Sequence, residues 1–255
     1  MRSLIICEGK TDLYVIQHFL EKAGDWKFID KGMLPKRYGE FPDESGENPK
    51  FESYQHGDDY VDICAAGTDT RMDEGFAFLY QVNKTNPIFP VKQVFVVMDR
   101  DKRQIEDRLK KIGSDARRQR IQINKLENGK SNILALNFGD EIHLLNVIPI
   151  IIPFDEIGSL ETLLLKSIEE NSNEDKHVAL LAERYVESYI ELFPDKKSRR
   201  YLSKAKLPAK AKLSAAISIT HPDRTAWPYR ELVMSHNWEE YKLIKKHFKI
   251  FNELL

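Results

Sequence analysis

The amino-acid sequence predicts an α/β fold in which a parallel sheet is covered by helices on both faces. Short, continuous apolar runs are expected to form buried strands over residues 3–7, 60–66, 93–98 and 147–154. Helical patterns separate these runs, and strands that alternate with helices favour parallel pairing through right-handed crossovers. From residue 159 onward the apolar spacing is helical. We therefore predict a four-stranded parallel sheet followed by a helical C-terminal extension.

The segments between the predicted strands differ in character. Residues 12–23 and 73–83 repeat apolar side chains at helical spacing, and residues 102–120 form a charged helix with a thin apolar stripe. Residues 28–58 are rich in Gly, Pro, Glu and Asp, so an irregular surface insertion is expected there. Two apolar runs within residues 121–146 are expected to form a small side hairpin.

The last predicted strand contains Pro149 and Pro153. Because proline in a strand favours an edge, this strand is expected to lie at the margin of the sheet or to begin at Ile150. Helices are expected to start at Leu160 and to cover residues 178–192 and 238–255. The expected organisation is an α/β domain over residues 1–165, with the helical residues 166–255 packed on it.

Composition limits the functional classes. The chain has 255 residues, 42% of them apolar, and a formal net charge of -1, so any attraction to nucleic acid must come from local patches. Cys7 and Cys64 lack the spacing of a zinc motif and are expected to be buried thiols in a reducing compartment. The sequence shows no signal-peptide pattern and no apolar run near the ~20 residues of a membrane span. We expect a cytoplasmic protein without a membrane partner.

Acidic residues stand where two of the predicted strands end. Glu8 follows the first strand and precedes Gly9, whereas Asp99 and Asp101 follow the third. Ligands of open α/β sheets bind at the carboxyl ends of the strands, where these side chains are expected to meet. Residues two apart in an extended segment point the same way, so Asp99 and Asp101 could share one cation. Because such hard oxygen ligands suit Mg²⁺ or Mn²⁺, the sequence predicts a divalent-metal site.

These acidic residues also have simpler interpretations. Asp99 and Asp101 could belong to a turn or a helix cap. Asp12 could be a charge in the first turn of a helix, where the macrodipole favours an anion. Glu8 is harder to explain in this way, because a solvated glutamate has no need to stand at the exit of an apolar strand.

Considered together, Glu8-Gly9-x-x-Asp12 and Asp99-x-Asp101 resemble the motifs of the Toprim domain, and the run from Ile63 to Gly67 supplies a glycine-ended strand between them. The resemblance covers roughly residues 3–165 and is greatest to OLD-family nucleases and small stand-alone bacterial Toprim proteins. It implies a Toprim-like parallel four-stranded sheet with helices on both faces and Mg²⁺ at the strand ends. Glu8 would be the general base or acid and a metal neighbour, and Asp99 and Asp101 would be the metal-binding pair.

Ser159-Leu160-Glu161 resembles the Ser-x-Glu element that OLD-type nucleases use for a second metal, whose site Asp12 would support. The alternative is a helix N-cap at Ser159 with a favourable first-turn acid at Glu161. OLD-type nucleases also use a lysine from a later helix, which implies Lys210 or Lys212 as a catalytic residue. They usually carry an ATPase domain, which this sequence lacks, so a separately encoded ATPase is a candidate partner.

Residues 196–212 contain eight basic residues and no acidic residue. A nucleic-acid phosphate backbone is the natural partner of such a cluster, although a solvated helix face is the simpler interpretation. The residues expected to bind nucleic acid are Lys196, Lys197, Arg199, Arg200, Lys204 and Lys206.

The leading hypothesis is a Mg²⁺- or Mn²⁺-dependent phosphodiesterase that cleaves DNA or RNA, because divalent ions activate water and stabilise the leaving oxygen. One alternative is a non-catalytic module that binds nucleic acid or a partner protein. Another is a nucleotidyl-transfer enzyme.

Overall fold

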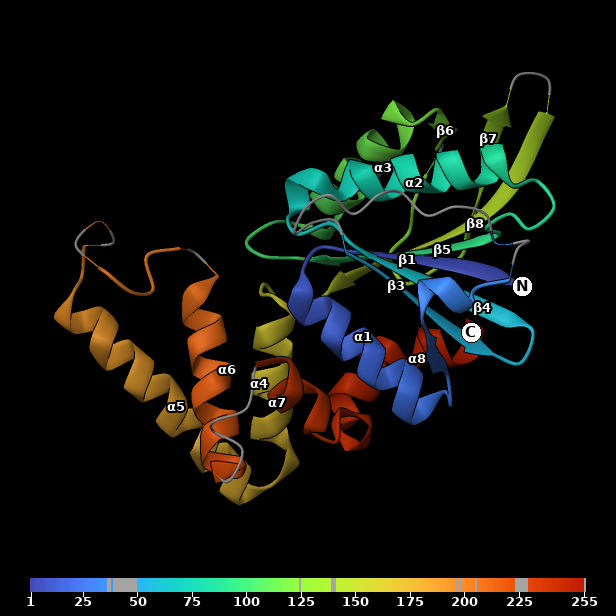
Figure 1. Cartoon of the computed structure of the whole chain (residues 1–255). Helices are drawn as coiled ribbons and strands as arrows, with labels where there is room; N and C mark the ends of the chain where they lie inside the picture. Colours follow the sequence, from blue (N-terminus) through green and yellow to red (C-terminus); the bar gives the residue numbers. More distant parts are fainter. Residues whose placement is uncertain are drawn as a thin grey trace.

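The sheet of the computed structural model has eight strands within the described residues, which are 1–35, 38, 50–123, 125–138, 141–195, 197, 199–204, 206–222 and 229–254. The strands are β1 (Arg2–Cys7), β2 (Lys27–Ile29), β3 (Lys50–His56), β4 (Asp59–Ala65), β5 (Gln93–Asp99), β6 (Ile121–Gln122), β7 (Asn132–Phe138) and β8 (Glu141–Ile152). Their spatial order is β2-β3-β4-β1-β5-β8-β7-β6 (Figure 1). The predicted α/β class is confirmed, although the sheet is mixed and larger than the four-stranded sheet expected.

The four strands predicted from the sequence lie at the centre of this sheet. β1 pairs in parallel with β4 and β5, and β5 pairs in parallel with β8. Every residue of β1 and β5 is buried, because helices cover both faces of the parallel strands, and this explains their continuous apolar runs. Parallel pairing brings the carboxyl ends of these four strands to one edge of the sheet.

Antiparallel strands extend the sheet on both sides. β3 pairs with β4, and β2 pairs with β3, so the predicted irregular insertion over residues 28–58 was wrong where it includes these strands. Residues 36, 37 and 39–49 of that insertion lie outside the described residues. On the other side β7 pairs with both β6 and β8, and the predicted side hairpin is therefore part of the main sheet.

β8 lies inside the sheet and begins at Glu141, so the predicted margin position and the predicted start at Ile150 were both wrong. Its pairing with β7 ends at Val147, and Pro149 lies beyond that ladder. The Pro149 carbonyl accepts a hydrogen bond from the Gly129 N–H at 2.7 Å. The missing N–H of the proline therefore faces the loop that contains Gly129, and an interior strand tolerates it.

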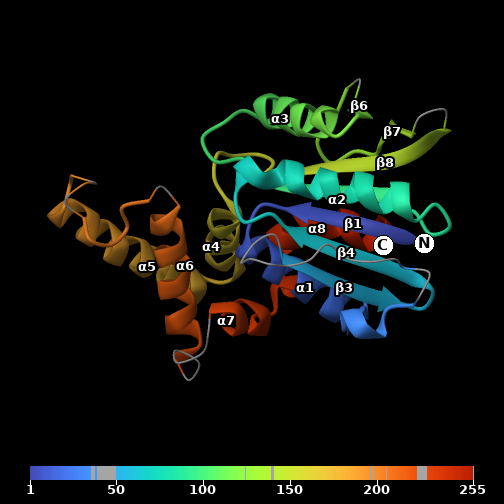
Figure 2. The same ribbon diagram turned by 45° about the horizontal axis from the view of Figure 1, so that its top comes forward.

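Helices cover both faces of the sheet (Figures 1 and 2). α2 (Met72–Thr85) and α3 (Ile105–Arg118) cover one face, and α1 (Lys10–Ala23), α4 (Leu160–Asn171) and α8 (Lys242–Leu254) cover the other. Alternate β1 residues serve the two cores: Ile5 packs in the core of α1, α4 and α8, whereas Ile6 packs in the core of α2 and α3. α2 approaches β1 so closely that a Cβ added at Gly75 would lie 2.5 Å from Ile6.

The C-terminal part is helical, as the sequence predicted. α5 (Asn173–Leu192) and α6 (Leu207–Thr220) project from the sheet as a helical hairpin, and α7 (Tyr229–Ser235) leads back toward α8 (Figure 1). Phe248 of α8 stacks on Phe19 with ring centroids 4.9 Å apart, and Phe251 lies 5.0 Å from Phe95 of β5. Short 3-10 helices cover Lys31–Met33, Asp69–Arg71 and Trp238–Glu240.

None of the helices in the described part of the chain is long and apolar enough to cross a membrane.

A buried ion pair connects β1 with β4. The Arg2 guanidinium lies 3.0 Å from the Asp62 carboxylate, and both side chains are almost completely buried. Asp62 also accepts hydrogen bonds from Ser53 at 2.7 Å and from the hydroxyl of Tyr38, whose carbonyl accepts from Arg2 at 3.0 Å. Each charge is thus paired and hydrogen-bonded, which is the condition for keeping ions in a core.

We expect Asp62→Asn to lower the free energy of unfolding by roughly 3–5 kcal/mol, because the buried Arg2 loses its counter-ion. Urea unfolding followed by circular dichroism measures this change. Asp59→Asn removes the exposed pair between Asp59 and the N-terminus and should cost less than about 1 kcal/mol. Equal effects of the two substitutions would contradict the role given to the buried pair.

His236 is a second buried polar residue with a consequence for stability. Its ring lies 4.2 Å from Trp238 and 4.9 Å from His221, and its Nε2 contacts the hydroxyl of Tyr241. Burial, followed by the charge of His221, lowers the pKa of His236 from 6.5 to about 4. The unfolded chain therefore takes up this proton at a higher pH than the folded protein does.

Because the folded pKa is the lower one, acid should destabilise the protein as the pH falls from about 6.5 to about 4. The loss attributable to His236 is about 2–3 kcal/mol across that window. Unfolding titrations at several pH values should show a flatter dependence for His236→Gln than for the wild type. The exposed His177→Gln control should keep the wild-type slope, and parallel curves for all three proteins would reject the assignment.

Candidate functional site

A pocket of about 250 Å³ opens at the carboxyl ends of the parallel strands. Glu8 follows β1, the turn at Gly67 follows β4, Asp99 ends β5, and Glu161 lies shortly after β8. The residues that line the pocket are Glu8, Gly9, Thr11, Asp12, Gly67, Thr68, Asp69, Asp99, Glu161, Lys206 and Lys210. The structure therefore brings together acidic residues that the sequence placed at separate strand ends.

Glu8 and Asp12 are positioned by the start of α1. Gly9 is the N-cap residue of this helix, and its N–H donates to the Asp12 Oδ2 at 2.7 Å. Glu8 and Asp12 are each 5% exposed. The first-turn position predicted for Asp12 is present, and the same residue also lines the pocket, so its two interpretations are compatible.

Asp99 connects β5 with the start of α4. Its Oδ1 accepts a hydrogen bond from the Leu160 N–H at 2.8 Å, within the first turn of that helix. Ser159 is the N-cap residue of α4, and its hydroxyl donates to the Glu161 Oε2 at 2.8 Å. The loop after β8 thus orients both the Asp99 and the Glu161 carboxylates beside the pocket.

The extended segment expected at Asp99 and Asp101 was wrong, although their carboxylates lie 2.8 and 3.9 Å from one cation, the Lys206 ammonium. β5 ends at Asp99, and Asp101 adopts a left-handed backbone with φ of 54°. Two backbone hydrogen bonds with Gly158, of 2.6 and 3.0 Å, hold it in that conformation. Asp101 consequently borders the pocket instead of lining it.

Arg108 was missed by the sequence analysis. Its side chain is fully buried and pairs with Asp101 and, at 3.1 Å, with Asp69. Its Nε also donates to the Arg100 carbonyl at 3.4 Å. The sequence of α3 has the pattern of a charged surface helix. The spacing of its charged residues does not distinguish Arg108 from the exposed residues around it.

Lys206 lies at the centre of the acidic group, not in a nucleic-acid surface as predicted. Its Nζ pairs with Glu8, lies 2.8 Å from the Asp99 Oδ2 and lies 3.9 Å from the Asp101 Oδ1. Burial lowers the pKa of this ammonium, but the charges of Asp99 and Glu8 outweigh burial and hold the pKa well above its ordinary value. Lys206 is therefore a permanent cation within a group of carboxylates.

The two lysines proposed as catalytic lie in different places. The Lys210 Nζ is 3.6 Å from the Glu161 Oε1 and lines the pocket. Lys212 is not brought to the site, because it pairs with Glu183 and Glu187 of α5 at 3.5 and 2.7 Å. The two residues are two positions apart on α6, so a helix directs them to different sides.

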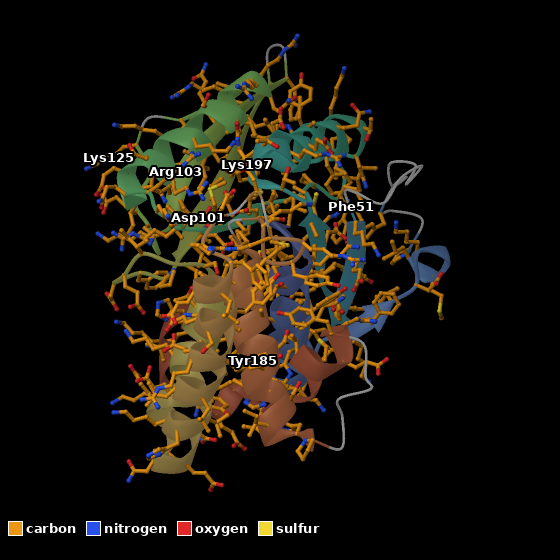
Figure 3. The ribbon with its side chains drawn as sticks, turned by 90° about the vertical axis from the view of Figure 1, so that its left-hand side faces the viewer. Phe51, Asp101, Arg103, Lys125, Tyr185 and Lys197 are labelled. Atoms are coloured by element: carbon orange, nitrogen blue, oxygen red, sulfur yellow. The ribbon has the colours of Figure 1, made fainter. Side chains whose placement is uncertain are left out.

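The residues predicted to bind nucleic acid also lie in different environments. Lys197, Arg200 and Lys204 are exposed, and the Arg200 guanidinium lies 5.5 Å from the Tyr201 ring centre. Arg199 is buried and bonds to the carbonyls of Phe193 and Pro194 at the end of α5, so it is not available to a ligand. Lys196 lies outside the described residues. Figure 3 looks onto the α5–α6 hairpin and shows Lys197 and Asp101 on this side of the molecule.

Burial and the charges of neighbouring carboxylates raise the pKa values of three residues in the pocket, Glu8, Asp12 and Asp99. Burial, then the charge of Asp99, raises the pKa of Glu8 from 4.5 to about 7 against the opposing effect of Lys206. Burial raises the pKa of Asp12 well above its ordinary value, and Asp99, Glu8 and Glu161 add to the shift. Burial raises that of Asp99 despite Lys206. Protons or cations that neutralise the negative charge of these carboxylates are therefore favoured at this site.

The residues fit a divalent cation in chemistry but do not enclose one as they stand. The Glu8 Oε2 is buried and has no hydrogen-bond partner among the described residues, and hard carboxylate oxygens surround the pocket. Within the described part of the chain, no three His, Cys, Asp or Glu side chains are already arranged around one ion position. The Lys206 ammonium occupies the space between Glu8 and Asp99.

These features define an α/β protein with a carboxylate cluster at the carboxyl ends of its parallel strands. The chain belongs to the family described as "Protein of unknown function (DUF3226)", whose model matches residues 2–253. The structure is similar to the crystal structure of hypothetical protein PH0156 from Pyrococcus horikoshii OT3, with a TM-score of 0.48, 18% sequence identity and coverage of 98% of this chain and 100% of that chain. No curated protein matches the sequence.

In the absence of divalent cations, Glu8→Gln should stabilise the protein above neutral pH. The folded pKa of Glu8 is the higher one, so its ionisation costs stability as the pH rises from about 4.5 to about 7. Glutamine has the neutral form at every pH, and the expected gain at pH 8 is about 2–3 kcal/mol. Unfolding in EDTA at pH 4 and pH 8 measures it. The exposed Glu191→Gln should be neutral at both pH values, and a Glu8→Gln protein that is less stable at pH 8 would contradict the expectation.

Proposed function

We propose that this protein is a Mg²⁺- or Mn²⁺-dependent phosphodiesterase that cleaves DNA or RNA at a Toprim-like carboxylate site. The observation that carries the proposal is the convergence of Glu8 and Asp99 from the ends of β1 and β5 with Glu161 from the start of α4. One buried Glu8 oxygen there has no hydrogen-bond partner among the residues that the structure describes. The parallel order β4-β1-β5-β8 is compatible with the four-stranded sheet that the motif resemblance implies.

The pocket residues have distinct proposed roles. Glu8 and Asp99, bordered by Asp101, would hold one cation, and Asp12 and Glu161 would support a second. The ions supply water activation and neutralisation of phosphate charge when bound. With its pKa near 7, Glu8 can accept a proton close to neutral pH.

Positive side chains near the pocket suit a phosphodiester substrate. Lys210, beside Glu161, would offset the charge that develops on the phosphate. Lys197, Arg200 and Lys204 are exposed on the connection between α5 and α6, where they would contact the phosphate backbone. Tyr201 is 61% exposed beside Arg200 and would provide a surface on which a base stacks.

The proposed cellular setting is the cytoplasm, with a separately encoded ATPase as a candidate partner. Cys7 and Cys64 are buried, and neither forms a disulfide in the described part of the chain, which fits a reducing compartment.

One observation favours a second candidate, a non-catalytic module that binds nucleic acid. Lys206 already neutralises Glu8 and Asp99, and a site with a permanent internal cation can be stable without a catalytic ion. Tight, salt-sensitive binding of an oligonucleotide without turnover would select this candidate.

Labelled single- and double-stranded DNA and RNA oligonucleotides, incubated with Mg²⁺, Mn²⁺ or EDTA, test the proposal. Wild-type protein should cleave at least one substrate with a divalent cation and none with EDTA. Glu8→Gln and Asp99→Asn should each reduce the rate at least about 100-fold, because each removes a cation ligand at the reacting centre.

Lys212→Met is the matched control for this assay. Lys212 pairs with α5 away from the pocket, so its removal should change the rate less than about threefold. Equal cleavage by wild type, Glu8→Gln and Asp99→Asn would reject the carboxylate mechanism.

A further inference from the structure

The carboxylates of the pocket already have a cation, and it belongs to the protein. Lys206 is the only lysine among the described residues whose Nζ pairs with three of the predicted metal ligands, Glu8, Asp99 and Asp101. Its contacts with Glu8 and Asp99 are direct hydrogen bonds from Nζ. The ammonium thus lies where a cation shared by the carboxyl ends of β1 and β5 would lie.

Lys206 does not come from the sheet. It is the N-cap residue of α6, and its carbonyl accepts from the Lys210 N–H at 3.3 Å. The residues before it form the connection from α5, which carries the exposed Lys197, Arg200 and Lys204. A displacement of the Lys206 side chain would therefore occur at the junction between the carboxylate site and this basic connection.

A lysine ammonium and a divalent cation cannot both occupy the space between Glu8 and Asp99. The ammonium lies 2.8 Å from the Asp99 Oδ2, the oxygen of that residue that does not bond to Leu160. A dication that took this oxygen together with Glu8 would meet the positive charge of Lys206 at contact distance. Cation binding at this pair of carboxylates therefore requires Lys206 to leave.

We propose that Lys206 is a built-in counter-ion that competes with the divalent cation for Glu8 and Asp99, so that cation binding and release of Lys206 are one coupled event. This inference rests on the metal site of the proposed function and adds its regulation. If the competent state, with Lys206 released, is populated about 1–10% of the time, the apparent cation affinity is reduced about 10- to 100-fold.

Titration calorimetry with Mn²⁺ on the full-length protein tests the competition. Lys206→Met should bind Mn²⁺ about 10- to 100-fold more tightly than the wild type. Lys210→Met is the charge-matched control: it removes an equal charge from the same pocket, but Lys210 contacts Glu161 and not Glu8 or Asp99. An increase in Lys206→Met that is no larger than in Lys210→Met would be a general charge effect and would overturn the proposal.

A second measurement uses the wild-type protein and does not depend on a variant that folds. The amines are acylated briefly with and without Mn²⁺, and the modified lysines are quantified by mass spectrometry. Mn²⁺ should increase the modification of Lys206 severalfold and leave the exposed Lys204 unchanged. Unchanged modification of Lys206 at saturating Mn²⁺ would overturn the proposal.

The outcomes separate this inference from the proposed function. If Mn²⁺ binds wild type and Lys206→Met equally, and Glu8→Gln abolishes binding, the metal site stands and the competition is rejected. If neither wild type nor Lys206→Met binds Mn²⁺, the metal site itself is rejected, and the competition with it.

Discussion

The burial of several carboxylates at one edge of the sheet is the constraint on which the rest of this structure depends. Glu8, Asp12 and Asp99 are each 5% exposed, and burial raises the pKa of all three. The charge of Asp99 raises the pKa values of Glu8 and Asp12 further. Such a group persists only where protons, cations or hydrogen-bond donors compensate it. The compensation comes from distant parts of the chain: the Leu160 N–H at the start of α4 and the Lys206 ammonium before α6. The helical C-terminal part therefore covers the edge of the sheet and also supplies groups that compensate its negative charge.

The parallel strands at the centre of the sheet could be predicted because burial on both faces leaves a pattern within each strand's own sequence. Strands buried on both faces must be apolar throughout, and β1 and β5 have that pattern in the sequence. The antiparallel strands were harder to predict. β2 is three residues long, β6 is two, and β7 and β8 leave Ile133 and Leu144 exposed, so their side chains lack a clear two-sided burial pattern. Their pairing is determined by neighbours that the linear sequence does not display.

The same distinction applies to the site. Glu8 and Asp99 could be identified because a carboxylate at the exit of an apolar strand is unusual within a few residues of sequence. Arg108 and Lys206 could not, because each is one basic residue in a charged segment, and only tertiary contacts distinguish it. The direction of Asp101 also depends on a distant partner, the Gly158 backbone. The sequence was therefore sufficient to identify the acidic residues of the site. The basic residues that pair with them could be identified only from the folded structure.

The position of α8 has a consequence for synthesis of the chain. Phe248 and Phe251 pack on Phe19 and Phe95, which precede them by more than 150 residues in the chain and leave the ribosome earlier. Until α8 has emerged, one face of the nascent sheet lacks its aromatic cover and presents apolar surface to other proteins. Surfaces of this kind favour aggregation and chaperone binding, so the sheet remains vulnerable until α8 has docked.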